Sequence, residues 1–411
     1  MSKITRLTCV ILALMFSLTM LFACTDNNGN KPTYEDDPDK TLPTTNILLA
    51  SNGTTDYKIV LPENPQKKEL VARNELVEFL NKATGATFAV VSDNGLTFNP
   101  QDKYISVGNT EILATSGVTV EQDKLTSDGY RIVTKGNTVI IAGPSDYGTL
   151  YGVYAFLNWQ IGFETYAEDE VYYETKTELK LLKYDEAEAP DFEKRQLGYY
   201  TAWSIDSYRD RLRVERHGKD WIYGSHSHFT ILPKATYYAQ HRDWYSSDGT
   251  QLCLTNEEMR KEFVARLKYI ISSHPDEHYI LLGAEDVNSF CYCDNCQKAI
   301  AKYGTESGVD MVFVNKVARD INAWLEQTDP DRFIYIGTFA YNKTIPAPVK
   351  KDANGEYVPT HVDVVAEPNV FIYFAPLGAN FSYGFLDEEH NSEIAQSMLG
   401  WKIICPTFCI W

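Results

Sequence analysis

The sequence predicts two folded domains, an α+β domain followed by a (β/α) barrel of the TIM type that is incomplete at its C-terminal end. The 411 residues exceed the usual size of one domain. Residues 46–185 mix short strand patterns with amphipathic helices, whereas residues 192–411 alternate apolar strand patterns with helices, as parallel βα units do. One such strand, Tyr279–Leu282, runs into the adjacent carboxylates of Glu285 and Asp286, as barrel strands do at a catalytic mouth.

The first 23 residues have the pattern of a secretory signal. Lys3 and Arg6 precede an apolar run, Val10–Phe22, and Ala23 is a small residue before a cleavage point. The run is shorter than the about 20 residues that a spanning helix needs. A cysteine at position 24 resembles a bacterial lipobox, which implies lipidation of Cys24. The alternative is an ordinary signal with an incidental cysteine.

Residues 24–45 are predicted to be a flexible acidic tether, because they are polar and cannot bury enough apolar surface to become ordered. Acidic residues soon after Cys24 resemble the surface-export signal of Bacteroidetes lipoproteins, which implies the outer membrane or cell surface. Removal of residues 1–23 takes away Lys3 and Arg6, so the net charge of −18 becomes −20. We therefore expect no nucleic-acid partner, since that affinity rests on neutralising phosphates, and no membrane contact besides the anchor.

In residues 46–185 we expect a small, mostly antiparallel sheet with helices laid on it. Pro65–Ala83 has helical apolar spacing and Gly85 is its C-cap, while Gly136-Asn137 predicts a hairpin turn. The expected strands are Asn46–Ala50, Phe88–Val91, Tyr104–Val107, Tyr130–Val133 and Thr138–Ala142, with a helix from about Tyr147. Residues 183–191 read as a polar connector between the domains.

The second domain is expected to supply six or seven parallel strands over roughly 220 residues, whereas a full barrel has eight strands and about 250 residues. The expected strands are Gln196–Ala202, Trp221–Ser225, Gln251–Leu254, Tyr279–Leu282, Phe333–Phe339, Val370–Phe374 and Lys402–Cys405. A capping box at Thr255–Glu258 opens one helix and Ser307–Gln327 forms another. We therefore expect a barrel cut short by a truncated gene product or a fragment.

The carboxylates after Leu282 are the candidate catalytic groups. Neighbouring strand residues face opposite sides, so only one of Glu285 and Asp286 can point into the barrel mouth. Glycoside hydrolysis typically uses two carboxylates about 5 to 9 Å apart, one of them an acid. We predict Asp286 as acid or base, and the equally weighted alternative is that its side chain caps the following loop.

Histidines and aromatic residues near strand ends are the candidate sugar contacts. His226 and His228 flank Ser227, and period two in a strand would send both imidazoles to one face. Aromatic rings suit stacking on pyranose rings, although such residues more often pack in a core. The predicted substrate-binding residues are His226, His228, Trp221, Trp203, Tyr200 and Trp244.

Four cysteines have a spacing typical of a structural site. Cys291, Cys293 and Cys296 form C-x-C-x-x-C, and Cys253 from the preceding unit is the expected fourth member. A tetrahedral Cys₄ site would hold structural zinc and pin the loop after the fourth strand. Disulfides are the rival, since the mature protein lies outside the cytoplasm, and free thiols are the third reading.

Two motif groups resemble known families. The run GPSDYGTLYGVYAFLNWQIGFETYAEDE (143–170) resembles the domain that precedes the barrel in α-glucuronidases of glycoside hydrolase family 67 and β-hexosaminidases of family 20. The motifs W-x-x-G-x-H-x-H-F (221–229), Q-L-C-L-T-N (251–256) and E-D-x-N-x-F-C-x-C-x-x-C (285–296) resemble the domain of unknown function 4838 (DUF4838) family of surface lipoproteins. This resemblance covers 44–411 and implies a glycosidase-like fold without an established reaction.

The resemblance also qualifies the mechanism. Family 20 enzymes carry G-G-D-E at this strand end, whereas Gly283–Asp286 reads G-A-E-D, so the acidic order is inverted. We expect a surface-anchored, glycosidase-like lipoprotein that hydrolyses complex glycans with carboxylate acid/base catalysis and requires no cofactor. The alternative is a glycan-binding lipoprotein without catalysis.

Overall fold

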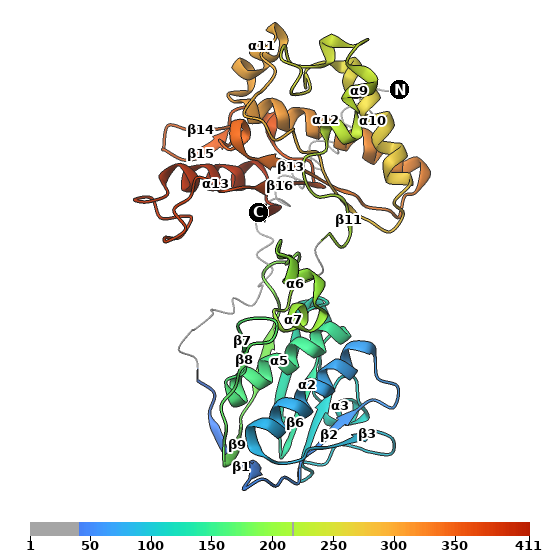
Figure 1. The fold of residues 1–411 in the computed structure, drawn as a ribbon, viewed down its shortest axis with the longest axis vertical. Coiled ribbons are helices and arrows are strands. Elements are labelled where there is room, and N and C mark those ends of the chain that lie inside the picture. The colour runs from blue at the N-terminus through green and yellow to red at the C-terminus, as the bar shows by residue number, and fades with distance from the viewer. Residues whose placement is uncertain (1–40, 216–217) are drawn as a thin grey trace, which may run out of the picture. The chain divides into compact units, whose positions relative to one another are not determined.

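The computed structural model describes residues 41–215 and 218–411 (Figure 1). The predicted signal, the lipidation site at Cys24 and most of the tether lie outside these residues. The chain divides into two compact units, Met1–His217 and Gly218–Trp411. This division follows the predicted connector at 183–191, so residues 192–215 belong to the first unit. No helix in the described ranges combines the length and the apolar character needed to cross a bilayer.

The first unit is built on a six-stranded mixed sheet. Its strand order is β10-β5-β6-β4-β2-β3, and strands β1 and β9 form a separate antiparallel pair. The elements are β1 (Thr44–Ser51), β2 (Lys58–Leu61), α2 (Lys67–Thr84), β3 (Ala89–Ser92), β4 (Tyr104–Val107), α3 (Glu111–Ser116), α4 (Gln122–Leu125), β5 (Tyr130–Lys135), β6 (Thr138–Ala142), α5 (Asp146–Ile161), β7 (Glu164–Thr165), β8 (Val171–Tyr172), β9 (Glu178–Leu182), β10 (Asp185–Glu188), α6 (Tyr200–Ser204) and α7 (Asp206–Arg211).

The two long helices of this unit begin and end where local chemistry favours it. At α2, Gln66 forms a capping box with Glu69, and Gly85 ends the helix in the left-handed conformation at φ 71°, as predicted. At α5, the Ser145 side chain accepts a hydrogen bond from the Gly148 N–H. The apolar faces of both helices pack into one core with the sheet, so this unit has a hydrophobic core of its own.

The expectation of a mostly antiparallel sheet is wrong. Within the six-stranded sheet, strands β2, β3, β4 and β6 pair in parallel, and the two pairings that involve β5 are antiparallel. The hairpin turn at Gly136 identifies β5 and β6, whereas parallel neighbours are joined by crossovers that leave no local turn signal. Strand β10 lies inside the stretch that we expected to be a connector.

The second unit is built on a five-stranded parallel sheet in the order β11-β12-β13-β16-β17. Its elements are β11 (Trp221–Tyr223), α8 (His228–Ile231), α9 (Lys234–Tyr237), η1 (Arg242–Trp244), α10 (Glu257–Ser272), β12 (Tyr279–Leu281), α11 (Asp294–Tyr303), α12 (Glu306–Thr328), β13 (Tyr335–Ala340), η2 (Asn342–Thr344), β14 (Val349–Lys351), β15 (Tyr357–Pro359), η3 (Val362–Val364), β16 (Val370–Phe374), α13 (Ser392–Ile404) and β17 (Phe408–Ile410).

The two faces of this sheet differ in chemistry. Along β12, Ile280 and Leu282 join the core formed with α10 and α12, whereas Tyr279 and Leu281 join an aromatic cluster on the other face. The same alternation holds along β16, where Phe371 belongs to the aromatic cluster. Helices on one face and a second apolar face opposite are what each unit of a (β/α) barrel wall presents.

The described part of the second unit is an open α/β sheet, and three predicted strands are not strands. Helix α6 begins at Tyr200, inside the expected strand Gln196–Ala202, and Gln196 forms an isolated bridge to Glu215. Gln251–Leu254 forms no strand beyond an isolated bridge from Leu252 to Tyr245, and Lys402–Cys405 contains the last turn of α13. Short apolar runs do not distinguish a strand from a helix by periodicity, which explains these errors.

Candidate functional site

The candidate site lies where β12 and β13 reach their carboxyl ends. Glu285 and Asp286 follow β12, and their side chains form hydrogen bonds with different neighbours. The Glu285 carboxylate accepts a hydrogen bond from the Phe229 N–H at 2.8 Å. The Gln251 amide donates to the Glu285 carbonyl at 2.8 Å and accepts from the Glu285 N–H at 3.1 Å. Glu285 is therefore held on both its backbone and its side chain.

Asp286 is the exposed carboxylate of the pair. Tyr341 directly follows β13, and its hydroxyl donates a hydrogen bond to the Asp286 carboxylate at 2.8 Å. This bond raises the pKa of Tyr341, because deprotonation would place two negative charges side by side. Tyr341 thereby orients Asp286 at the strand end, and Asp286 remains exposed.

The two histidines do not share a face, so that prediction is wrong. His226 makes an isolated bridge to Gly283, and its Nδ1 contacts the Ala284 carbonyl. The chain turns at Ser227 (φ −138°, ψ −6°) and enters α8, which carries His228 into the core with 1% of its surface exposed. Period two applies only while a strand continues. His226 stays beside the candidate site, and His228 becomes a buried residue.

Buried polar groups lie behind the strand ends. His228 and Asp310 both line a cavity of about 30 Å³, which is room for one water molecule. Burial, and secondarily the charge of His226, lowers the pKa of His228 to about 4. Burial raises the pKa of Asp310 to about 7, against the hydrogen bond of 2.6 Å that it shares with Thr338. The His228 side chain is therefore largely neutral near pH 7, whereas the Asp310 carboxyl is about half protonated there.

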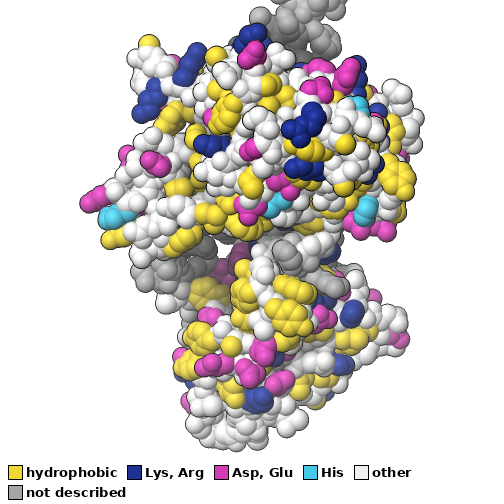
Figure 2. All heavy atoms as spheres, turned by 45° about the horizontal axis from the view of Figure 1, so that its top comes forward, with side chains coloured by type: hydrophobic (Ala, Val, Ile, Leu, Met, Phe, Trp, Pro, Cys, Tyr) yellow, Lys and Arg dark blue, Asp and Glu magenta, His cyan; other side chains and the backbone are white. Residues whose placement is uncertain are grey.

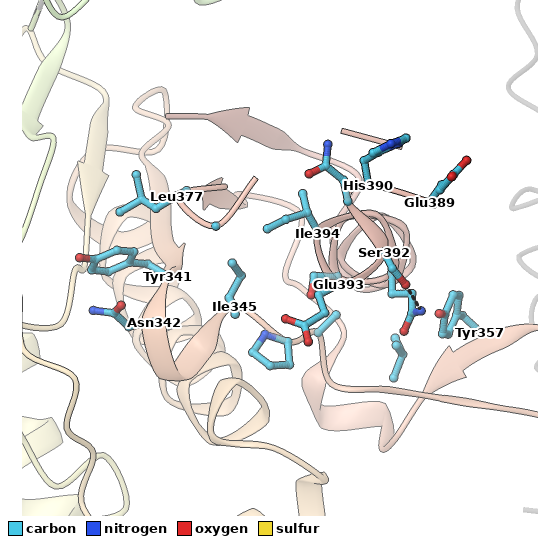
Figure 3. A pocket seen from close by; sticks show the side chains of 18 residues that line it. Tyr341, Asn342, Ile345, Tyr357, Leu377, Glu389, His390, Ser392, Glu393 and Ile394 are labelled. Atoms are coloured by element: carbon cyan, nitrogen blue, oxygen red, sulfur yellow. Dashed lines mark hydrogen bonds between the residues drawn. The ribbon is translucent and has the colours of Figure 1, made fainter. Parts of the chain in front are cut away.

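A larger cavity of about 850 Å³ lies at the carboxyl ends of β13 and β16 (Figure 3), and Tyr341, the hydrogen-bond partner of Asp286, lines it. Tyr341 and Asn342 line one side, and His390 and Glu393 line the side formed by the start of α13. The volume is within the range of small-ligand sites, about 300 to 1,000 Å³. Its lining of amide, carboxylate and aromatic groups is suited to hydroxyl-rich ligands.

The aromatic residues predicted to contact substrate lie in different places in the structure. Trp244 is 5% exposed and packed between Tyr237 and His241, so it is a core residue and its predicted role is wrong. Trp221 begins β11 and packs against Tyr279 and Tyr373 on the aromatic face of the sheet, at the end away from the carboxylates. Tyr200 and Trp203 lie on α6 in the first unit, and their predicted role stays a prediction.

The four predicted cysteines do come together. The sulfur atoms of Cys253, Cys291, Cys293 and Cys296 all lie within 4.8 Å of one another. None is in a disulfide, and all but Cys293 are buried. They could hold one metal ion beside the segment that carries Glu285.

Comparison with protein families decides where the second unit belongs. Residues 165–411, more than half of the chain, match the family described as "Domain of unknown function (DUF4838)". The chain belongs to the DUF4838 family. Residues 51–156 match the model described as "Glycosyl hydrolase family 67 N-terminus", as the resemblance of residues 143–170 implied in part. A comparison with curated proteins gave no match.

Solved structures similar to this DUF4838 chain are glycosidases. A GH20 β-N-acetylhexosaminidase from Streptomyces coelicolor A3(2) is 11% identical with a TM-score of 0.41, over 90% of this chain and 73% of that one. The Flavobacterium johnsoniae chitobiase (FjGH20) is 10% identical with a TM-score of 0.38, over 81% of this chain and 53% of that one. CpGH84D is 14% identical with a TM-score of 0.37, over 90% of this chain and 59% of that one. The chain thus spans little more than half the length of two of these proteins.

Sequence reasoning missed Asp310 of the DUF4838 domain. Asp310 lies in the first turn and a half of α12 between Val309 and Met311, with 3% of its surface exposed. The available signal was an ionisable residue flanked by apolar ones at the start of a buried helix. The prediction considered only carboxylates at strand ends, and Asp310 is on a helix.

Proposed function

We propose that the second unit is a glycosidase-like domain that binds a glycan at the carboxyl ends of its strands and cleaves a glycosidic bond with Asp286 as acid or base. The observation that carries the proposal is the placement of Asp286, which is exposed and oriented by Tyr341, a residue that itself lines the cavity of about 850 Å³. Active sites of (β/α) barrels lie at this end of the sheet. We infer further that the five parallel strands form part of a barrel wall.

The cavity supplies the acidic groups that a second catalytic role would need. Glu389 and Glu393 both line it, whereas Glu285 is engaged by the Phe229 N–H. We therefore assign Glu285 a positioning role. The candidate catalytic partners of Asp286 are Glu389 and Glu393, near the start of α13. His226, beside Tyr341 at a ring separation of 6.1 Å, is the candidate contact for a sugar hydroxyl.

The second candidate function is glycan binding without hydrolysis. The engagement of Glu285 favours it, because the adjacent carboxylates then cannot act as a pair. The inverted acidic order at Gly283–Asp286 favours it as well. Figure 2 shows acidic and basic side chains interspersed over the visible face of the second unit, so a neutral glycan meets no large surface of one charge there.

Hydrolysis of a panel of chromogenic glycosides and binding to a glycan array separate the two functions. We expect Asp286→Asn to lower kcat/KM by about 10² to 10⁴, the usual contribution of one acid or base, with binding retained. Asp276→Asn is the matched control, because Asp276 is an exposed aspartate at the opposite end of β12. Glycan binding by wild type without turnover on any substrate would establish the binder instead.

We also propose that the protein is anchored to the outer membrane or cell surface by lipid on Cys24. The support is the sequence of residues 1–45, in which a charged start and an apolar run precede this cysteine and an acidic polar stretch follows it. The anchor would hold the glycan-binding unit outside the cell, where complex glycans occur.

A further inference from the structure

The four-cysteine cluster has the size of a site for one metal ion. In a zinc–thiolate tetrahedron with Zn–S bonds of about 2.3 Å, the sulfur atoms are about 3.8 Å apart. The Cys253 sulfur lies 3.7 Å from the Cys293 sulfur and 3.7 Å from the Cys296 sulfur. A disulfide would require about 2.05 Å. These two separations match a zinc–thiolate tetrahedron, and all four sulfur atoms lie within 4.8 Å of one another, close enough for one ion to bind them all.

We propose that Cys253, Cys291, Cys293 and Cys296 bind one zinc ion that fastens the loop after β12. An iron–sulfur cluster fits less well, because inorganic sulfides and several irons would hold the four thiolates farther apart. Zinc has no redox chemistry and closes such sites with four protein ligands. The site therefore stabilises structure and leaves no position open for substrate.

The surroundings suit the charge of the bound form, since four thiolates around Zn²⁺ carry a net charge of −2. Cys293 is the N-cap of α11, and Cys296 lies in its first turn. The N-terminus of this ten-residue helix favours negative charge. The Thr255 hydroxyl lies 3.1 Å from the Cys296 sulfur and can donate a hydrogen bond to that thiolate.

The ion would join two segments that meet at the candidate site. Cys253 follows Gln251, whose amide holds the backbone of Glu285. Cys291 ends the loop that starts at Asp286. Zinc would thus fix both ends of the 286–291 loop. It would hold the end of the loop directly through Cys291, and the start through Cys253 and the nearby Gln251, which holds the backbone of Glu285. This role is independent of whether Asp286 performs catalysis or the domain only binds glycans.

Metal content and metal spectroscopy of the purified full chain test the proposal. We expect about one zinc ion per chain, lost in Cys291→Ser and in Cys296→Ser. Cys405→Ser is the matched control, because Cys405 is equally buried but lies outside the cluster, on the Val370 carbonyl. Cobalt exchanged into wild type should give the intense visible bands of a tetrahedral thiolate site, which adventitious surface binding does not give.

Cys293 offers a variant that does not disturb the core, since its side chain is exposed. Cys293→His should keep the zinc, because Cys₃His sites are common, whereas Cys293→Ala should weaken zinc binding at least about tenfold in a competition with a chromogenic chelator. Removal of zinc should raise hydrogen exchange in residues 286–296 and leave the first unit unchanged.

Three results would overturn the proposal. One is metal-free protein whose four thiols all react with a thiol reagent under native conditions. The second is a disulfide between any two of the four cysteines, found by mass spectrometry of unreduced peptides. The third is iron in place of zinc at one per chain in protein expressed with both metals supplied.

Discussion

Two buried side chains of the second unit respond to pH in opposite directions. Asp310 has a folded-state pKa of about 7, above its ordinary value, so its contribution to stability falls as pH rises from about 4 to 7. His228 has a folded-state pKa of about 4, below its ordinary value, so its contribution falls as pH decreases from about 6.5 to 4. The two effects oppose each other in one pH window, and a substitution is needed to separate them.

We expect Asp310→Asn to gain stability relative to wild type as pH rises. The amide keeps the shape and the bond to Thr338 and removes the proton equilibrium. The difference should grow by up to about 1.4 kcal/mol per pH unit between pH 4 and 7. Urea unfolding at several pH values measures it, with the exposed Asp331→Asn as the control. A difference that stays constant with pH would show that Asp310 is already ionised in the folded protein.

At the residue scale, a motif of closely spaced residues predicted which side chains come together. The sequence did not predict which side chains are exposed to solvent. The C-x-C-x-x-C pattern and Cys253 identified the residues that the fold brings together. Trp244 and His228 were expected at a binding surface, but both are buried. Whether a side chain faces solvent depends on the packing of distant elements, such as α10 and α12, which no local pattern specifies.

Ion pairs hold helix α7 onto helix α2 in the first unit. Lys68 and Asp210 pair at 2.6 Å with 8% and 3% of their side chains exposed. Arg211 makes two hydrogen bonds of 2.9 Å to the Glu75 carboxylate. Such contacts across 136 and 142 residues of sequence are why the segment that follows the predicted connector belongs to this unit.

We expect Asp210→Ala to destabilise the protein by roughly 3 to 5 kcal/mol, because it leaves the buried Lys68 ammonium unpaired. Thermal unfolding followed by calorimetry measures the loss. Asp206→Ala is the control on the same helix, since Asp206 pairs with Arg209 but is 75% exposed and should cost less than about 1 kcal/mol.

A double variant identifies the cause of that loss. Lys68→Met with Asp210→Leu removes both charges and should recover most of the stability, since apolar replacements of a buried pair are often neutral. A double variant as unstable as Asp210→Ala alone would mean that lost packing, and not the unpaired charge, destabilises the single variant.

Elements with strong local signals were predicted closely. Strands β4, β6 and β16 have the predicted bounds, and α12 differs from the prediction by one residue at each end. Gly85 ends α2 because a left-handed residue is needed there. The N-cap of α10 is Asn256, one residue later than the capping box implied. The alternation of strands and helices predicted the parallel sheet of the second unit. The sheet direction of the first unit was predicted wrongly, because its parallel pairs are joined by crossovers and leave no turn signal.

At the scale of the whole molecule, the two-domain organisation was readable from pattern and the division point was not. A polar stretch at 183–191 resembles a linker in composition, yet Asp185–Glu188 pairs with β5 as an edge strand. The remaining whole-molecule expectation concerns residues 1–40, outside the described part, and it rests on sequence chemistry alone.

We expect Cys24→Ser to release the protein from the membrane, because it removes the thiol that would carry the lipid. Wild type should partition into the detergent phase of Triton X-114 and incorporate labelled fatty acid, and the variant should do neither. Cys9→Ser is the control, since Cys9 lies in the part of the leader that cleavage would remove. Detergent partitioning that persists in Cys24→Ser would exclude this cysteine as the anchor. Wild type that incorporates no labelled fatty acid would favour the ordinary secretory signal.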